Sequence, residues 1–396
     1  MTEKKDGYIP PQEKEPAQKE WWEVARTKEV GFVGDLNGSI KAFLKNLLDL
    51  GYITLKKKEN GQEVTKEEIE KINEISDYEI NNLLSSHKME WTGTDKPQVL
   101  LGDILGDRAG NGDRVFHLIM ALEKKGADIT VLVGNHDVGA FLALVGGRPN
   151  DNRLHLIPDQ APLTEYQHYE DWATGTYNQE EMYKNPDMVE HIQQIKKMKV
   201  GAVIDDTFFA HADVDPDQFI ALYKKYNPDD TLSFRETIEK MNATFKEALD
   251  EGFPEIPGAF GDTIIDHTNP MTRKFRLNEL CKPGEILSVL CGWPANRFIK
   301  RQGTDPVSGA RIVETHEYPD YFFEFLKKRG INAFVFGHND AFTTFTKNNT
   351  LIIPADGLSE KTQEPGDYSY SNGKIHTNGH IDISVGKRHE QNVRSR

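Results

Sequence analysis

Five positions in the sequence place a side chain that can bind a metal ion shortly after an apolar segment. The apolar segments are 30–33, 98–101, 129–133, 202–210 and 331–336, and the polar residues that follow them are Asp35, Asp103, Asn135, His211 and His338. Carboxylate, amide and imidazole groups are common metal ligands in proteins. Each position alone has an ordinary structural explanation, such as a hydrogen-bonded histidine at a strand end. Five of them in one chain predict a shared site.

The segment 100–108 carries the densest group of such residues. Its apolar run ends in Gly102-Asp103, and Asp107 and Arg108 follow within five residues. A short apolar run that stops at Gly-Asp is typical of a buried strand that ends in a turn. Open α/β sheets bind their ligands at the carboxyl ends of strands. The segment therefore predicts a turn that holds metal ions and an anion, and the alternative is a solvated acidic turn.

Alternating strands and helices are expected to position these residues. After the strand 30–33, Ser39 can cap a helix whose apolar residues recur at helical spacing over 40–48. Further strands are expected at 98–101, 129–133, 202–210 and 331–336, with an amphipathic helix at 114–125. The segments 343–346 and 350–353 predict a hairpin. Two highly polar stretches, 56–96 and 159–198, are interpreted as insertions. The Glu/Lys-rich middle of the first predicts a surface helix or a partly mobile insertion, and the second is expected to be helical. This order predicts an α/β (α+β) fold.

Composition narrows the class of partner. The chain has 396 residues and a net charge of -15, so most of its surface would repel a nucleic acid backbone, and we expect no nucleic acid partner. We expect one domain over 21–384, interrupted by the two insertions, between a disordered tail at 1–20 and a basic tail at 385–396. The sequence does not indicate an oligomeric state.

Location follows from what the sequence lacks. Residues 1–20 contain no apolar segment of the kind that a secretory leader needs, and no apolar run is long enough to span a membrane. The two cysteines, Cys281 and Cys291, fit a reducing compartment. We expect a cytoplasmic location, either in the producing cell or in a host cell if the protein is a secreted effector.

The ordered motifs resemble those of the calcineurin-like metallophosphoesterases, and most closely those of the phosphoprotein phosphatase family within them. The family pattern is Gly-Asp-x-His-Gly, Gly-Asp-x-x-Asp-Arg, Gly-Asn-His-Asp/Glu, a lone His and then Gly-His. The matching segments are 34–38, 102–108, 134–137, His211 and 337–338. The resemblance covers roughly 30–357 and implies a four-layer fold, two mixed β-sheets packed face to face and flanked by helices. The insertions and the divergent motifs also resemble the Wip-type bacterial effector phosphatases.

The resemblance implies a phosphatase that hydrolyses phosphomonoesters on proteins, at serine or threonine, at tyrosine, or at both. It implies two divalent metal ions, with Mn²⁺ favoured and Fe, Zn or Mg as alternatives. Asp35 would bind the first ion, Asp103 would bridge the two, and the second ion would be bound by Asn135, His211 and His338. Such a pair of ions lowers the pKa of a shared water and holds the phosphoryl oxygens.

The resemblance also implies roles for the residues that surround the metal ions. His136 would act as the general acid, and Asp107 would orient its imidazole. Arg108 would bind the phosphate oxygens in a forked contact. A second phosphate-binding arginine is expected later in the chain, and the sequence does not choose among Arg297, Arg301 and Arg311.

Three departures from the family pattern concern the site. Asn37 stands where the family has a histidine on the first metal, which should shift that ion toward Mn²⁺ or Mg²⁺ because an amide oxygen is the harder ligand. Asp340, two residues after His338, can compensate as a further ligand, or it caps a turn. Gly106 lengthens the turn between Asp103 and Asp107, and Ala212-Asp213 replaces two glycines.

Two other functional classes remain open from the sequence. One is a catalytically weak pseudophosphatase that serves as a binding scaffold, for which Asn37 would mark a decayed metal site. The other is a nucleotide or dinucleoside polyphosphate hydrolase on the same fold. Phosphate release with Mn²⁺ and with chelator separates the three.

Overall fold

Two five-stranded sheets form the centre of the computed structural model. It describes residues 28–36, 38–71, 83–93, 96–105, 112–144, 186–252, 280, 282–292, 300–304, 311–315, 318–338, 345–347, 350–355, 371–376 and 381–385. The first sheet has the order β14 (Ile381–Val385), β13 (Ser371–Ile375), β1 (Val30–Val33), β4 (Gln98–Leu100), β5 (Ile129–Val131). The second has the order β11 (Phe345–Lys347), β12 (Thr350–Pro354), β10 (Ala333–Phe336), β7 (Thr207–Ala210), β6 (Gly201–Ile204).

Both sheets are mixed, as the sequence predicted for this fold class. In the first sheet β1, β4 and β5 are parallel, while β13 and β14 run antiparallel to their neighbours. In the second, β7, β10 and β12 are parallel and the edge strands β6 and β11 are antiparallel. All of these parallel strands except β12 precede a candidate ligand.

One cluster of buried apolar side chains is shared by the two sheets. A cluster of buried apolar residues joins alternate positions of β1, β4 and β13 to alternate positions of β6, β7, β10 and β12. Phe32 and Phe209 meet within it, with ring centroids 6.5 Å apart. Because strand side chains alternate between faces, the intervening residues point outward to the helices.

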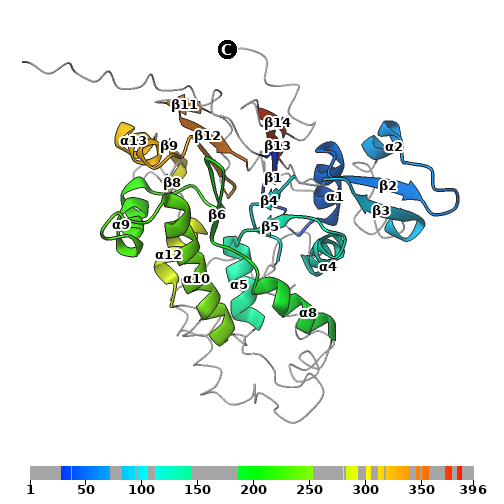
Figure 1. Ribbon diagram of the computed structural model, residues 1–396, viewed down its shortest axis with the longest axis horizontal. Coiled ribbons are helices and arrows are strands. Elements are labelled where there is room, and N and C mark those ends of the chain that lie inside the picture. The colour runs from blue at the N-terminus through cyan, green and yellow to red at the C-terminus, as the bar shows by residue number, and fades with distance from the viewer. Residues whose placement is uncertain are drawn as a thin grey trace, which may run out of the picture.

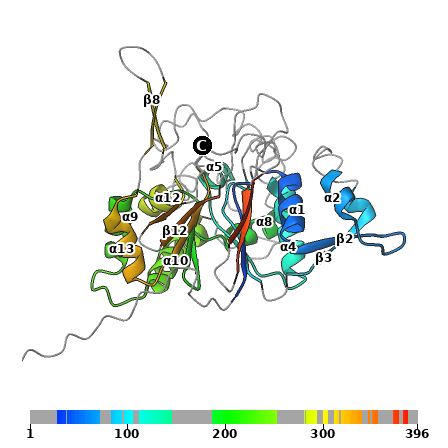
Figure 2. The ribbon, with the colours of Figure 1, turned by 90° about the horizontal axis from the view of Figure 1, so that it is seen from above.

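Helices cover the outer faces of the sheets (Figures 1 and 2). On one side lie α9 (Pro216–Tyr226), α10 (Phe234–Gly252), α12 (Gly284–Leu290) and α13 (Asp320–Lys328). On the other side lie α1 (Ile40–Asp49) and α4 (Gly112–Glu123), and α5 (Asn135–Leu144) and α8 (Pro186–Ile195) follow below them in Figure 1. The predicted cap is confirmed, since the Ser39 side chain accepts a hydrogen bond from the Ala42 backbone N–H at 3.1 Å. No helix in the described ranges is both long and apolar enough to cross a membrane.

Two sequence predictions need correction. The stretch 56–96 was interpreted as a helical insertion, but its two ends belong to strands, because β2 (Ile53–Lys57) pairs antiparallel with β3 (His87–Trp91). Of the described residues between these strands, α2 (Lys66–Lys71) and residues 83–86 are helical. Met89 is buried in the main core, so β3 places an apolar side chain on the inner face although the segment is rich in charge. The single strand expected at 202–210 is the hairpin β6–β7, because Asp205 adopts a left-handed turn conformation with φ 50°.

Other expectations agree with the structure or lie outside it. The hairpin expected near 343–353 is β11–β12, which closes at Lys347 and Thr350. Of the second insertion, residues 186–195 form α8, and the part at 159–185 lies outside the described residues. The same holds for the expected tail at 1–20 and for residues 386–396 of the tail expected at 385–396. A further hairpin, β8 (Lys300–Thr304) with β9 (Arg311–Thr315), forms a separate two-stranded sheet.

Phe208 gives a prediction about the stability of the second sheet. Its buried ring stacks on Phe334 at 5.0 Å between centroids and contacts Phe219 and Phe234 on α9 and α10. Replacing it by alanine removes this contact between sheet and helices, and we expect the free energy of unfolding to fall by about 3–5 kcal/mol. Chemical denaturation followed by circular dichroism measures the change. A loss below about 1 kcal/mol would contradict this packing.

Candidate metal centre

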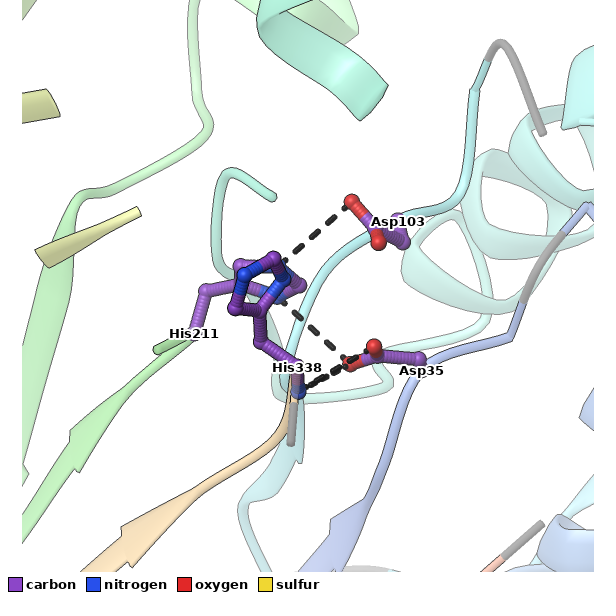
Figure 3. A group of neighbouring side chains, drawn as sticks. All are labelled: Asp35, Asp103, His211 and His338. Atoms are coloured by element: carbon purple, nitrogen blue, oxygen red, sulfur yellow. Dashed lines mark hydrogen bonds and ion pairs between the residues drawn. The ribbon is translucent and has the colours of Figure 1, made fainter. Parts of the chain in front are cut away.

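The five predicted ligands follow five parallel strands of the two sheets. Asp35, Asp103 and Asn135 follow β1, β4 and β5 of the first sheet, and His211 and His338 follow β7 and β10 of the second. Ligand atoms of Asp35, Asp103, His211 and His338 all lie within 4.8 Å of one another, and all four residues are buried. Figure 3 shows the two carboxylates facing the two imidazoles across the gap between the sheets. The structure therefore brings four of the five predicted ligands into one cluster.

Asp35 links the two sheets at the site. Its carboxylate accepts from the backbone N–H of His338, with distances of 3.2 and 3.1 Å to its two oxygens. Its Oδ1 also lies 3.5 Å from Nδ1 of His211. A Cβ atom at position 337 would overlap Oδ1 of Asp35, which explains why the Gly-His motif needs its glycine.

Asp103 sits in a turn of unusual conformation. Its φ is 52°, and that of His338 is 64°, so two of the four clustered residues adopt left-handed backbone angles that residues other than glycine rarely adopt. Asp103 Oδ1 accepts from the backbone N–H of His136 at 3.0 Å. A Cβ atom at position 134 would overlap the Asp103 carboxylate. Strained residues of this kind are concentrated at functional sites.

A backbone carbonyl just after β4 holds the His211 ring in one orientation. Its Nδ1 lies 2.7 Å from the carbonyl oxygen of Leu101, which can only accept, so Nδ1 carries the proton in this contact. In the neutral imidazole the lone pair is then on Nε2, 3.2 Å from Asn135 Oδ1 and 3.6 Å from Asp103 Oδ1. Lone pairs of a nitrogen and two oxygens thus converge.

This donor set fits a divalent cation. Two carboxylates and two imidazoles, buried together, offer the mixed oxygen and nitrogen ligands that suit Mn²⁺, Fe and Zn. The backbone carbonyl that orients His211 is the kind of outer partner that metal-bound histidines have. Asn135, the half-buried first residue of α5, places its amide oxygen beside His211 Nε2.

His136 lies beside the cluster and is less buried than the four ligands. Its Nε2 is 3.9 Å from Asp103 Oδ2, and 17% of its side chain is exposed. Its backbone N–H donates a hydrogen bond to Asp103, which fixes the residue at the start of α5. The imidazole remains partly exposed to solvent. This position allows it to meet a molecule that enters from outside.

Asp137, to which the sequence assigned no role, binds the backbone on both sides of the site. It is fully buried and accepts hydrogen bonds from four backbone N–H groups, at positions 103, 104, 105 and 134. Burial and the charge of Asp103 act to raise the pKa of Asp137, while the hydrogen bonds from Leu105, Gly134 and Ile104 act to lower it. The acidic fourth position of the Gly-Asn-His-Asp motif was the available signal.

Cys291 follows α12 and lies within reach of the same charges. Burial, and then the carboxylates of Asp137 and Asp103, raise the pKa of its thiol well above the usual value. Among the described residues, Cys291 is not part of the group whose ligand atoms come together.

Several predicted site residues lie outside the described residues. These are Asn37, Asp107, Arg108, Arg297 and Asp340, together with Gly106. Arg301 and Arg311 belong to β8 and β9, where Arg301 pairs with Glu314 and Arg311 with Thr304, and only their backbone is described. The roles given to these residues stay predictions.

No protein-family model and no curated protein matches the chain. Solved structures do match it. A cold-active protein-tyrosine phosphatase of a psychrophilic Shewanella species is 12% identical at a TM-score of 0.44, and the match covers 90% of this chain and 80% of that one. The phosphatase domain of the Legionella effector WipB is 21% identical at a TM-score of 0.37, covering 63% of this chain and 91% of that domain.

A third match is a protein serine/threonine phosphatase of Saccharomyces cerevisiae, described as similar to human phosphatase PP5. It is 10% identical at a TM-score of 0.36, with 90% of this chain and 79% of that chain covered. All three of these solved structures are described as phosphatases.

Proposed function

We propose that this chain is a metal-dependent phosphatase that hydrolyses phosphomonoesters on proteins. The observation that carries the proposal is the convergence of Asp35, Asp103, His211 and His338 from the ends of four strands in two sheets. Burying two carboxylates together costs free energy unless an opposite charge compensates them. A site that has this cost and strained backbone at two of its four residues is explained better by function than by stability.

The four buried residues would hold divalent cations, with Asn135 adding its amide oxygen. The proposed arrangement has two ions, with Asp35 on the first, Asp103 shared, and Asn135, His211 and His338 on the second. Mn²⁺ is the first candidate. When bound, such ions neutralise phosphoryl charge and supply a nucleophilic water of lowered pKa. Asn37 and Asp340 are proposed as further ligands of the first ion.

His136 is proposed to donate a proton to the departing oxygen of the substrate. Its backbone is anchored on the metal-binding Asp103, while its imidazole keeps access to solvent. A proton donor must reach the leaving group, which stays outside the buried cluster. Asp107 is proposed to orient the imidazole, and Arg108 with one of the later arginines to hold the phosphate.

The proposed fold is the four-layer metallophosphoesterase arrangement, supported by the apolar cluster shared by the two sheets. The proposed substrates are phosphoserine, phosphothreonine and phosphotyrosine in proteins. The similar structures include a protein-tyrosine phosphatase and a serine/threonine phosphatase, so both classes of peptide belong in the test.

Metal removal tests the proposal. We expect phosphate release from p-nitrophenyl phosphate and from phosphoserine or phosphotyrosine peptides with Mn²⁺. We expect it to fall at least about 100-fold after removal of the metal by chelation and dialysis, because the buried carboxylates then lose the cation that pairs with them. Adding Mn²⁺ back should restore turnover. The measurement is phosphate release by a colorimetric assay, with Fe²⁺, Zn²⁺ and Mg²⁺ in parallel.

The same assay contains the outcomes that contradict the proposal. No turnover with any of the four metals would favour a binding scaffold. Faster release from nucleotides or dinucleoside polyphosphates than from every phosphopeptide would favour a nucleotide hydrolase on this fold.

A further inference from the structure

Asp137 joins the two turns that surround Asp103. Its Oδ1 accepts from the backbone N–H groups of Ile104 and Leu105, at 3.0 and 2.6 Å. Its Oδ2 accepts from the N–H groups of Asp103 and Gly134, at 2.9 and 2.8 Å. Three of these donors follow β4 and the fourth follows β5, so one carboxylate ties the ends of two neighbouring strands together.

The tie acts directly on the residue that is proposed to be shared by two metal ions. Asp103 is held at a positive φ, a conformation that is unfavourable unless the surroundings impose it. The bonds from Asp103, Ile104 and Leu105 fix the backbone on both sides of this unfavourable residue. The bond from Gly134 places that glycine where its missing side chain leaves room for the Asp103 carboxylate.

Other anchors of Asp103 are weaker. Its side chain accepts one backbone hydrogen bond, from His136 at 3.0 Å, and its distances to His211 and His136 side chains are 3.6 and 3.9 Å. Without Asp137, three consecutive N–H groups of the turn would lose their acceptor inside the protein, and buried unsatisfied N–H groups are unfavourable. The turn would have to rearrange, and Asp103 with it.

We infer that Asp137 is a positioning residue for the metal centre, setting the geometry of Asp103 through four backbone hydrogen bonds without contacting metal or substrate itself. The inference rests on the proposed metal-dependent function. Through its effect on Asp103, the fourth residue of the Gly-Asn-His-Asp segment would influence both metal affinity and turnover.

The sharpest test replaces Asp137 by asparagine, which has nearly the same shape. An amide has one oxygen and one NH₂ group, so in either orientation the NH₂ group faces two backbone N–H donors. We expect Mn²⁺ affinity, measured by calorimetric titration, to fall about 10- to 100-fold, the range seen when a partner of a metal ligand is lost. Hydrogen exchange should become faster at the amides of Asp103, Ile104, Leu105 and Gly134.

Asn242→Ala is the matched control. Asn242 is also buried and accepts two backbone hydrogen bonds, from Val200 at 3.0 Å and Gly201 at 3.3 Å, on the outer face of the second sheet. It should lower thermal stability and leave Mn²⁺ affinity unchanged. Equal losses of Mn²⁺ affinity in the two variants, or unchanged affinity in Asp137→Asn, would overturn the positioning role.

Asp137→Glu provides a second variant that keeps all acceptors. Its extra methylene displaces the turn in a closed space, so we expect faster exchange at the same four amides and a smaller loss of Mn²⁺ affinity. Faster exchange at these amides without any loss of affinity would overturn the inference. If the wild-type protein itself does not bind Mn²⁺, the proposed function fails, and that result is distinct from a wild-type protein and an Asp137→Asn variant that bind equally well.

Discussion

Replacing Asp103 by asparagine should remove most phosphatase activity and leave the fold intact. The variant loses the negative charge that is proposed to lie between two metal ions, while its amide oxygen can still accept from the His136 backbone N–H. Asparagine tolerates the φ of 52° better than most residues, so the turn is not strained further. Loss of a partner of a ligand costs about 10- to 100-fold, and loss of the shared ligand should exceed this, at least about 100-fold in kcat/KM.

The measurement is hydrolysis of a phosphopeptide with Mn²⁺, alongside a calorimetric titration of Mn²⁺ and a thermal melt. Asp206→Asn is the matched control, because Asp206 is a buried aspartate in the turn between β6 and β7, which accepts from the Asn332 side chain at 3.1 Å. It should retain activity. Activity of Asp103→Asn within about threefold of wild type would rule out Asp103 as the shared ligand.

The positions of the ligands were predictable because each follows a short apolar strand. Residues 30–33 and 333–336 are buried along their whole length, so they read as continuous apolar runs, and the chain turns polar where each run ends. Parallel strands put their carboxyl ends at one edge, which brings Asp35 and Asp103 together in the first sheet and His211 and His338 in the second. Local pattern was enough for this part of the site.

Neither the strand order within the first sheet nor the contact between the two sheets has a local signal in the sequence. Val30 pairs with Ile375, more than 300 residues away in the sequence, and β13 and β14 were not expected. The side chains that join the sheets, such as Phe32 and Phe209, are ordinary core residues in the sequence. The motif resemblance therefore suggests the four-residue cluster, but the distances between its side chains are known only from the structure.

Asp137 shows a second limit of the sequence. An acidic residue near the start of a helix is typical of a favourable interaction with the helix N-terminus, and this is the interpretation that pattern alone supports. In the structure its partners include the N–H groups of Ile104 and Leu105, which are more than 30 positions earlier in the chain. Backbone donors carry no sequence signature, so contacts of this kind cannot be predicted from residue types.

Replacing His136 by asparagine should slow hydrolysis in a way that depends on the leaving group. Loss of a general acid costs about 10²- to 10⁴-fold when the departing oxygen needs a proton. We expect that loss for a phosphoserine peptide, whose alkoxide is a poor leaving group, and a much smaller loss for p-nitrophenyl phosphate. Mn²⁺ affinity should stay unchanged, because the backbone N–H that binds Asp103 remains and the imidazole is not proposed as a ligand.

His376→Gln is the matched control for this prediction. His376 is also partly exposed and lies between two carboxylates, with Nδ1 2.9 Å from Glu29 and Nε2 2.8 Å from Asp382, and it follows β13, whose last residue pairs with the first residue of β1. Asp35 follows the opposite end of β1, so the control should leave both substrates unaffected. Equal losses for the two substrates in His136→Asn, accompanied by weaker Mn²⁺ binding, would instead make His136 part of the metal centre. An unchanged rate with the phosphoserine peptide would require a different proton donor, because an alkoxide cannot depart at neutral pH without one.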